Sequence, residues 1–260
     1  MRLRGLYGCA TVFSAMNQMA YHSIASSTDR FDFARAVETA VDGFVPHGAY
    51  VQRAAANAQG GQTPVALARR IAASSALDAN PIAELLLGAP DATVFATRWN
   101  GFNRSASLGV RTFIGSDGLR REPRGADDAF RAELIAEVIP RLTPCQRLDT
   151  SHRLCQLYDK DDVIRDVLEG LYQSPALNLN ETAARLGCSR RTLQRGLVGG
   201  GLTFRGLRQA VRVTLAGYQL RQPAGSVTDI AHRCGFFDSA HFVRAWRRAC
   251  SMAPSAYRDL

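Results

Sequence analysis

The sequence predicts two domains: a mixed α/β (α+β) domain over residues 1–160 and an all-α domain over residues 161–260. A chain of 260 residues is long enough to form two modest hydrophobic cores. Strand-like stretches occur only in the first part, and beyond residue 162 every segment between the turns has helical periodicity. The polar run Asp-Lys-Asp-Asp at residues 159–162 separates the two patterns, so we place the domain boundary there.

Helices and strands are both expected in the first domain. Apolar residues recur at intervals of three and four in five segments, which are residues 9–24, 33–44, 64–77, 130–142 and 145–158. Short stretches bounded by turn residues predict strands at 49–54, 92–98 and 107–114. Residues 115–127 are rich in Gly, Pro and Arg and predict a loop.

Positive charge is concentrated in the C-terminal third. The whole chain has 32 basic and 23 acidic residues, a formal net charge of +9. Residues 175–258 contain 13 Arg and no Lys against three acids, Glu181, Asp229 and Asp238, a net charge of +10. This excess indicates a polyanionic partner, of which nucleic acid is the commonest. A merely solvated basic surface is the alternative.

Cysteine usage and the absence of other motifs narrow the function. The six cysteines form no C-x-x-C pair and no zinc-ligand spacing with the five histidines, so they fit reduced core residues of a cytoplasmic protein. No apolar run approaches the length of a membrane span, and Asn17 and Gln18 interrupt the one stretch that resembles a signal peptide. No phosphate loop, carboxylate pair or nucleophile–base arrangement is present, so we expect no enzyme activity, no metal and no cofactor.

One structural unit occurs twice in the basic third. Ala183 is followed four residues later by Gly187, and Ala231 is followed four residues later by Gly235. An alanine lets two helices cross closely, because a larger side chain would push them apart. A glycine can end the first helix in a left-handed conformation that other residues adopt only at a cost. Each copy therefore predicts a helix that ends in a tight turn.

A second helix follows in each copy. Ser189 or Asp238 can accept hydrogen bonds from the free N–H groups at its start. Apolar residues four apart anchor it in a core, and these are the pairs Leu193/Leu197 and Phe242/Trp246. The opposite face carries arginines and can enter a DNA major groove, as the second helix of a helix-turn-helix does. We expect two such units, at 176–198 and 226–249, joined by a connecting helix around 205–220. A single copy would also fit a generic helical hairpin, and the presence of two copies argues against that alternative.

Residues 175–258 resemble the C-terminal DNA-binding domain of the AraC/XylS family of transcription regulators. The resemblance rests on T-A-A-R-L-G-C-S-R-R-T-L-Q-R from residue 182, S-V-T-D-I-A from 226, G-F-F-D-S-A-H-F-V-R-A-W-R-R from 235 and P-S-A-Y-R from 254. Trp246 replaces the usual Phe, and Ser251 stands where the family usually has Gly. The Gly199-Gly200-Gly201 run predicts a loose connection after the first unit. Gly217 predicts a weakened connecting helix, about 1 kcal/mol below Ala.

The resemblance implies a bacterial, cytoplasmic, sequence-specific regulator of transcription that binds double-stranded DNA. Carried over by position, it implies base contacts for Arg191, Gln194 and Arg195 in one major groove, and for Ser239, Ala240 and Arg244 in the next. It implies phosphate contacts for Arg190, His241, Arg247 and Arg248. Hydrogen bonds from Arg or Gln to a base edge discriminate against a wrong base by about 1–3 kcal/mol. Phosphate contacts only set the register of the protein on the duplex. Because Ala240 offers only a methyl group, we expect the second unit to be less selective.

Three further residues in the second unit and three arginines between the units are expected to have other roles. Scaffold positions are expected at Ser226, Val227 and Ile230. Solvated side chains on the connecting helix are expected at Arg205, Arg208 and Arg212.

Residues 1–160 are expected to be a sensor domain, a dimerisation domain, or both. Residues 92–148 contain two strand-like stretches, an arginine-rich loop and then Ile-Pro-Arg-Leu at 139–142, and are faintly similar to GAF/PAS-like sensor domains of LuxR-type regulators. That similarity implies a ligand pocket lined by Phe95, Trp99, Phe102 and Phe113, and the alternative is that these side chains fill a core. We therefore predict a regulator controlled by a small-molecule effector. The alternative is a regulator whose N-terminal domain only dimerises or binds a protein partner such as RNA polymerase.

Overall fold

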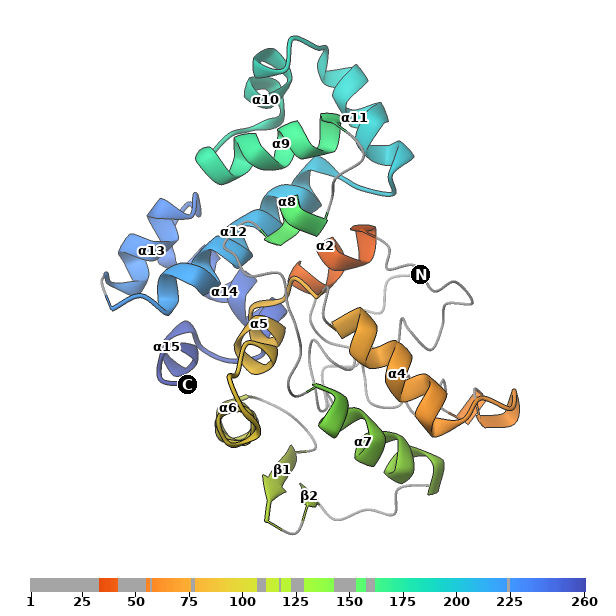
Figure 1. The fold of residues 1–260 in the computed structure, drawn as a ribbon. Helices are drawn as coiled ribbons and strands as arrows, with labels where there is room; N and C mark the ends of the chain where they lie inside the picture. Colours follow the sequence, from red (N-terminus) through yellow and green to blue (C-terminus); the bar gives the residue numbers. More distant parts are fainter. Residues whose placement is uncertain are drawn as a thin grey trace.

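The computed structural model describes ten stretches of the chain, which are residues 33–41, 55–56, 58–75, 78–106, 111–116, 118–122, 129–142, 153–157, 162–223 and 225–260. Helices dominate these stretches (Figure 1). The helix predicted at 9–24 and the strand predicted at 49–54 lie outside the described residues. Within these ten stretches, no helix combines the length and the apolar character needed to cross a bilayer.

The N-terminal part contains several short helices. They are α2 (Phe33–Val41), α4 (Pro64–Ser75), α5 (Pro81–Leu87), α6 (Ala92–Ser105), α7 (Ala129–Leu142) and α8 (Arg153–Leu157). Helices α2, α4 and α7 confirm three of the helical periodicities found in the sequence. Helix α8 confirms the described end of the helix expected over 145–158.

A single hairpin is the only sheet in the described part of the chain. Strand β1 (Arg111–Gly115) pairs antiparallel with β2 (Gly118–Glu122), with Phe113 opposite Arg120 and Ile114 opposite Leu119. The strand predicted at 107–114 is confirmed over its described end. The loop predicted at 115–127 is wrong over 118–122, where β2 lies. A mixed α/β fold for the first 160 residues is not confirmed, because their described residues are mainly helical.

The strand predicted at 92–98 is wrong, because these residues begin helix α6. The Asp91 carboxylate caps the helix by accepting a hydrogen bond from the Val94 N–H at 2.8 Å. Phe95, Trp99 and Phe102 recur at helical spacing and are at most 2% exposed. These three side chains therefore fill a core rather than line a ligand pocket. The residues at 92–98 include β-branched and aromatic side chains that favour a strand, whereas the helical period becomes evident only over the longer segment that ends at Ser105.

Helix α6 holds the hairpin through side-chain hydrogen bonds. The Trp99 indole N–H donates to the Thr112 carbonyl at 3.1 Å. The Asn100 side chain donates to the Ile114 carbonyl and accepts from the Ile114 N–H, both at 2.8 Å. The hairpin is therefore held against α6, and backbone groups of β1 are hydrogen-bonded to the side chains of Trp99 and Asn100.

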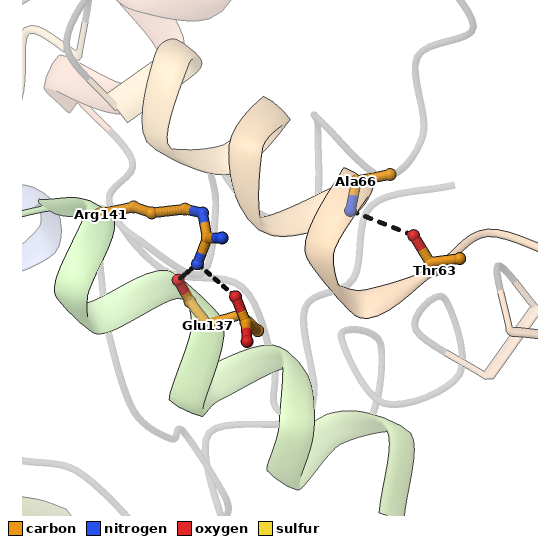
Figure 2. Close-up of polar contacts among 4 residues, drawn as sticks. All are labelled: Thr63, Ala66, Glu137 and Arg141. Carbon is orange, nitrogen blue, oxygen red and sulfur yellow. Dashed lines mark hydrogen bonds and ion pairs between the residues drawn. The ribbon is translucent and has the colours of Figure 1, made fainter.

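Helices α4 and α7 pack side by side (Figure 1). Their contact is apolar and buries a small core of Leu67, Ala68, Ile71 and Leu134. Figure 2 shows the polar contacts nearby: the Thr63 hydroxyl accepts from the Ala66 N–H at 3.2 Å, and Arg141 donates to Glu137 one turn earlier in α7. Each of these polar contacts is local in sequence, so apolar burial holds the two helices together.

The C-terminal part is all-α, as predicted. Its helices are α9 (Asp162–Gln173), α10 (Leu179–Arg185), α11 (Arg190–Gly199), α12 (Phe204–Leu220), α13 (Val227–Arg233), α14 (Ser239–Cys250) and α15 (Pro254–Arg258). Helices α10 and α11 form the first helix-turn-helix, and α13 and α14 form the second. The long helix α12 connects them (Figure 1).

N-terminal segments share the cores of the two units. Helix α2 adds Ala36, Val37 and Ala40 to the core of the first unit, beside Leu193 and Leu197. Helices α5 and α6 contribute to the core of the second unit, which contains Phe242, Trp246 and Tyr257. The two parts are thus packed directly on one another, and a domain boundary near residue 160 remains a prediction.

Candidate nucleic-acid interface

The turns of the two units have the same backbone structure. Gly187 has φ 63° and Gly235 has φ 76°, so both lie in the left-handed region that favours glycine. Three residues past each helix end, an N–H donates back to the alanine carbonyl: from residue 188 to Ala183 at 3.0 Å, and from residue 236 to Ala231 at 2.9 Å. These bonds satisfy the last free carbonyls of α10 and α13. Both glycine predictions are confirmed.

The second helix of each unit begins at the predicted cap. The Ser189 hydroxyl accepts from the Thr192 N–H at 3.1 Å, and the Asp238 carboxylate accepts from the His241 N–H at 2.6 Å. Each cap fixes where the helix starts and therefore which residues occupy its first turn. That first turn carries several of the predicted DNA contacts.

The first helix of each unit carries a capping box that was missed from the sequence. Asn178 and Glu181 exchange side-chain-to-backbone hydrogen bonds at 2.8 and 3.0 Å, and Ser226 and Asp229 do so at 3.1 Å each. Hydrogen bonds from the Ser226 hydroxyl and N–H lower the pKa of the Asp229 carboxyl. The patterns N-x-x-E and S-x-x-D would have identified both boxes. Ser226 is thus a scaffold residue, as expected.

Apolar anchors fix the second helix of each unit against the rest of the domain. Leu193 and Leu197 are 1% exposed in α11, and Phe242 and Trp246 are fully buried in α14. The Trp246 ring stands edge-on to the Tyr257 ring, with centroids 4.9 Å apart. The Trp246 indole N–H has no hydrogen-bond acceptor among the described residues. The replacement of the usual Phe by Trp therefore adds a buried polar atom that has no partner within the described part of the chain.

Most of the predicted contact residues lie on the exposed sides of α11 and α14. In α11 the exposed residues are Arg190, Arg191, Gln194 and Arg195. In α14 the exposed residues are Ala240, Arg244, Arg247 and Arg248, whereas Ser239 and His241 are half-buried. The structure thus collects each set on one helix with its buried anchors on the other side, and DNA contact by these residues remains a prediction.

His241 has a more restricted environment than the other predicted phosphate contacts. Its ring stands edge-on to the Phe236 ring, with centroids 5.4 Å apart. Burial lowers the pKa of His241, and the positive charges of Arg212 and Arg244 lower it further. The imidazole is therefore neutral at pH 7, so it can give a phosphate a hydrogen bond but no charge.

Arg212 is not solvated, contrary to expectation. It is 7% exposed; its Nε donates to the Pro175 carbonyl at 2.8 Å, and its guanidinium lies 5.8 Å from the centre of the Phe236 ring. Burial lowers its pKa to about 10. Arg208 is half-buried and donates to the Leu177 carbonyl at 3.2 Å, whereas Arg205 is exposed as expected. Helix α12 is thus tied to the turn before α10 and to the second unit.

The connection between the units is ordered rather than loose. Gly201 has φ 73°, and the Leu202 N–H reaches back to the Leu197 carbonyl at 2.9 Å, repeating the helix ending seen at Gly187. Leu202 is 4% exposed. Gly217 lies at a close helix contact, because a Cβ there would stand 2.9 Å from Pro81 Cβ. The glycine run is thus part of a hydrogen-bonded helix ending, and how rigidly the two units are spaced stays a prediction.

Two further residues distinguish the second unit. Ser251 ends α14 with φ 60°, the left-handed conformation for which the family usually has Gly. Phe237, in the turn just before the Asp238 cap, is 85% exposed. No role was assigned to Phe237 from the sequence, although an apolar residue at a tight turn beside a reading helix could have drawn attention to it.

Comparisons with known proteins agree with this geometry. Residues 182–259 match a family model described as a helix-turn-helix domain. The chain is 44% identical over 80 residues to the HTH-type transcriptional activator RhaS of Klebsiella pneumoniae (strain 342), which is 30% of this chain and 29% of that protein. It is 40% identical over 84 residues to RhaS of Escherichia coli (strain SE11), or 32% and 30% of the two chains. The chain thus matches less than a third of the length of these relatives.

A solved structure is similar at lower identity. A DNA-binding transcriptional dual regulator from Escherichia coli K-12 is 20% identical, with a TM-score of 0.36 over 37% of this chain and 95% of that chain, a likeness too distant to bear on function.

The paired units define residues 182–259 as a tandem helix-turn-helix domain. The helix-turn-helix match and the similarity to the RhaS activators agree with the AraC/XylS-type domain that the sequence resemblance implies. The GAF/PAS-like similarity expected within the first 160 residues is not shown by these comparisons or by the described helices of that part.

Proposed function

We propose that the protein is a sequence-specific DNA-binding regulator of transcription, which inserts α11 and α14 into two successive major grooves of double-stranded DNA. The observation that carries the proposal is the repeated unit itself. In both copies a capped helix buries its apolar anchors and exposes arginines on the other side. Such a helix matches the width and the negative charge of the major groove.

The first unit supplies the stronger base recognition. Arg191 and Arg195 are exposed guanidinium groups that suit guanine, and Gln194 suits adenine. Each such pair discriminates against a wrong base by about 1–3 kcal/mol. Arg190 follows the Ser189 cap directly and binds a phosphate, which sets the register of α11.

The second unit reads fewer hydrogen-bonding groups. Arg244 is its one long polar base contact, and Ser239 and Ala240 make short-range contacts. Phe237 adds an exposed apolar ring near the start of α14, which suits the methyl group of thymine. Phosphates are bound by Arg247 and Arg248, and by His241 as a neutral donor. This unit is therefore the less selective of the two.

The spacing of the two reading helices is fixed by the protein. Arg212 joins α12 to the Pro175 carbonyl and to the Phe236 ring of the second unit. The close contact at Gly217 holds the other end of α12 against Pro81. A rigid pair of units favours half-sites about one helical turn apart, roughly 10 base pairs.

The N-terminal part is proposed to control DNA binding in the cytoplasm in response to a small-molecule effector. The support is that α2, α5 and α6 pack directly on the cores of the two units. The second candidate is that this part only dimerises or binds a protein partner such as RNA polymerase. A saturable thermal shift with a small molecule favours the first candidate, because ligand binding to the native state raises its stability.

Selection of binding sites from random duplex DNA tests the proposal. We expect a preferred site of two half-sites about 10 base pairs apart, the one bound by α11 being the more strongly conserved among selected sequences. Enrichment of no sequence, with affinity that depends on salt alone, would reduce the domain to a non-specific DNA binder.

A further inference from the structure

A cavity of about 480 Å³ lies between the N-terminal part and the connecting helix. Helices α5, α8, α12 and α15 contribute to its walls, and Figure 1 shows α5 beside α12. Its lining includes Pro81, Glu84, Arg153, Tyr218, Arg221 and Tyr257. A volume of this size is typical of a site for a small molecule.

The charge of the lining favours an anion. Arg153 is 2% exposed and is held in place by a hydrogen bond from its Nε to the Asp78 carbonyl at 3.0 Å. Arg221 is exposed, and Glu84 is the one acid among the lining residues. Arg98 lies close to Arg221: burial lowers the pKa of Arg98, and the charge of Arg221 lowers it further. Among the lining residues there are thus two guanidinium groups, on Arg153 and Arg221, and one carboxylate, on Glu84.

The rest of the lining is suited to a flat apolar body. Pro81, Tyr218 and Tyr257 present a pyrrolidine ring and two aromatic rings. Aromatic side chains make favourable stacked or edge contacts with other rings. The combination of buried cation and ring-lined walls matches an aromatic acid better than a sugar or a cation.

One wall of the cavity is also the segment that holds the second reading helix. The Asn80 side chain is buried and donates to the Ala249 carbonyl in α14 at 2.7 Å and to the Thr39 carbonyl in α2 at 2.8 Å. Its neighbour Pro81 accepts a hydrogen bond from the Tyr257 hydroxyl at 3.2 Å. The first turn of α5 therefore contacts α2, α14 and α15 while it borders the cavity.

We propose that this cavity is the effector site, that its ligand is a small organic anion with a planar apolar body, and that occupancy alters how α14 is presented to DNA. This inference rests on the proposed DNA-binding function and deepens it by naming the site and ligand class. A ligand between α5 and α12 changes DNA affinity only if it binds the DNA-bound and the DNA-free chain unequally. Couplings of this kind change affinity by about 5- to 150-fold.

The binding test uses the full chain and two fluorescent probes with the same rings. 8-Anilinonaphthalene-1-sulfonate carries an anionic group, and N-phenyl-1-naphthylamine lacks it. We expect saturable binding of one sulfonate probe per chain and at least tenfold weaker binding of the neutral probe. Arg221→Gln should weaken the sulfonate probe at least fivefold, whereas Arg233→Gln, an exposed arginine of α13 outside the lining, should leave it unchanged. Equal binding of the two probes, or no effect of Arg221→Gln, would overturn the site.

The claim that occupancy of the cavity changes DNA binding is tested on the same samples, by measuring their affinity for the selected DNA site. Saturating sulfonate probe should change that affinity at least fivefold in the parent chain and in Arg233→Gln, and less than twofold in Arg221→Gln at the same probe concentration. Probe binding without any change in DNA affinity would overturn the regulatory role. Failure to bind any specific DNA would refute the proposed function instead, and the probe titration would then decide separately whether the cavity is an anion site.

Discussion

Gly217 of the connecting helix lies directly against Pro81, the first residue of α5: a Cβ at position 217 would stand 2.9 Å from Pro81 Cβ and 3.7 Å from the Trp246 ring. Gly217 lies in the last turn of α12, and a glycine within a helix is unfavourable by itself. Here it permits the N-terminal part, the connecting helix and the second reading helix to meet at one point. The spacing of the two units therefore depends on a contact with a segment more than 130 residues earlier in the chain.

Replacing this glycine tests the contact. Gly217→Ala should lower the free energy of unfolding by about 1 kcal/mol, because overpacking costs about 1–3 kcal/mol and the gain in helix propensity offsets only part of it. Gly170→Ala in α9 is the matched control: its Cβ would meet nothing within 4 Å, so it should raise stability by up to about 1 kcal/mol. Urea unfolding measures both. Equal stabilisation by the two changes would show that Gly217 is not at a close contact.

The two buried tryptophans should respond differently to removal of the indole N–H. Trp246 has no acceptor among the described residues, whereas the Trp99 N–H donates to the Thr112 carbonyl. Trp246→Phe should therefore lower the free energy of unfolding by less than about 1 kcal/mol, since the lost packing is offset by removal of an unsatisfied donor. Trp99→Phe should lower the free energy of unfolding by about 1–3 kcal/mol more than Trp246→Phe does, because it leaves the buried Thr112 carbonyl without its donor. Denaturant unfolding of both variants checks the difference, and equal losses would contradict it.

The left-handed residue at the end of α14 offers a stabilising change. Ser251 has φ 60°, a conformation that costs non-glycine residues about 1–2 kcal/mol. Ser251→Gly should raise the melting temperature, with a gain of about 1 kcal/mol in the free energy of unfolding. Ser255→Gly, at an exposed position within α15, is the control and should lower stability slightly. A loss of stability in Ser251→Gly would mean that the helix does not end in this way.

Features that depend on neighbouring residues were predictable from the sequence. The turns at Gly187 and Gly235 and the caps at Ser189 and Asp238 are short-range patterns, and each was found where expected. Helix α6 was not, because the β-branched and aromatic residues over 92–98 favour a strand when that short stretch is taken without the helical period that continues to Ser105.

Features that depend on distant contacts were not predictable. Arg212 looks like a solvated arginine until its partner, the Pro175 carbonyl, is known from the fold. Gly217 looks like a weakness in a helix until Pro81 is seen against it. Periodicity along one segment carries no information on which other segment will cover it, and for that reason the packing of α5 on the second unit had no signal in the sequence.

The central claim is that each reading helix recognises its own half-site. The most direct test measures the affinity of the parent chain, Arg195→Ala and Arg244→Ala for the selected DNA site and for versions with one half-site scrambled. Scrambling the α11 half-site should weaken the parent and Arg244→Ala at least tenfold but Arg195→Ala much less, since each good Arg–guanine pair contributes about 1–3 kcal/mol of discrimination. Scrambling the α14 half-site should give the converse pattern. If each variant loses affinity equally on every version of the site, neither arginine reads bases and the two-groove account is contradicted.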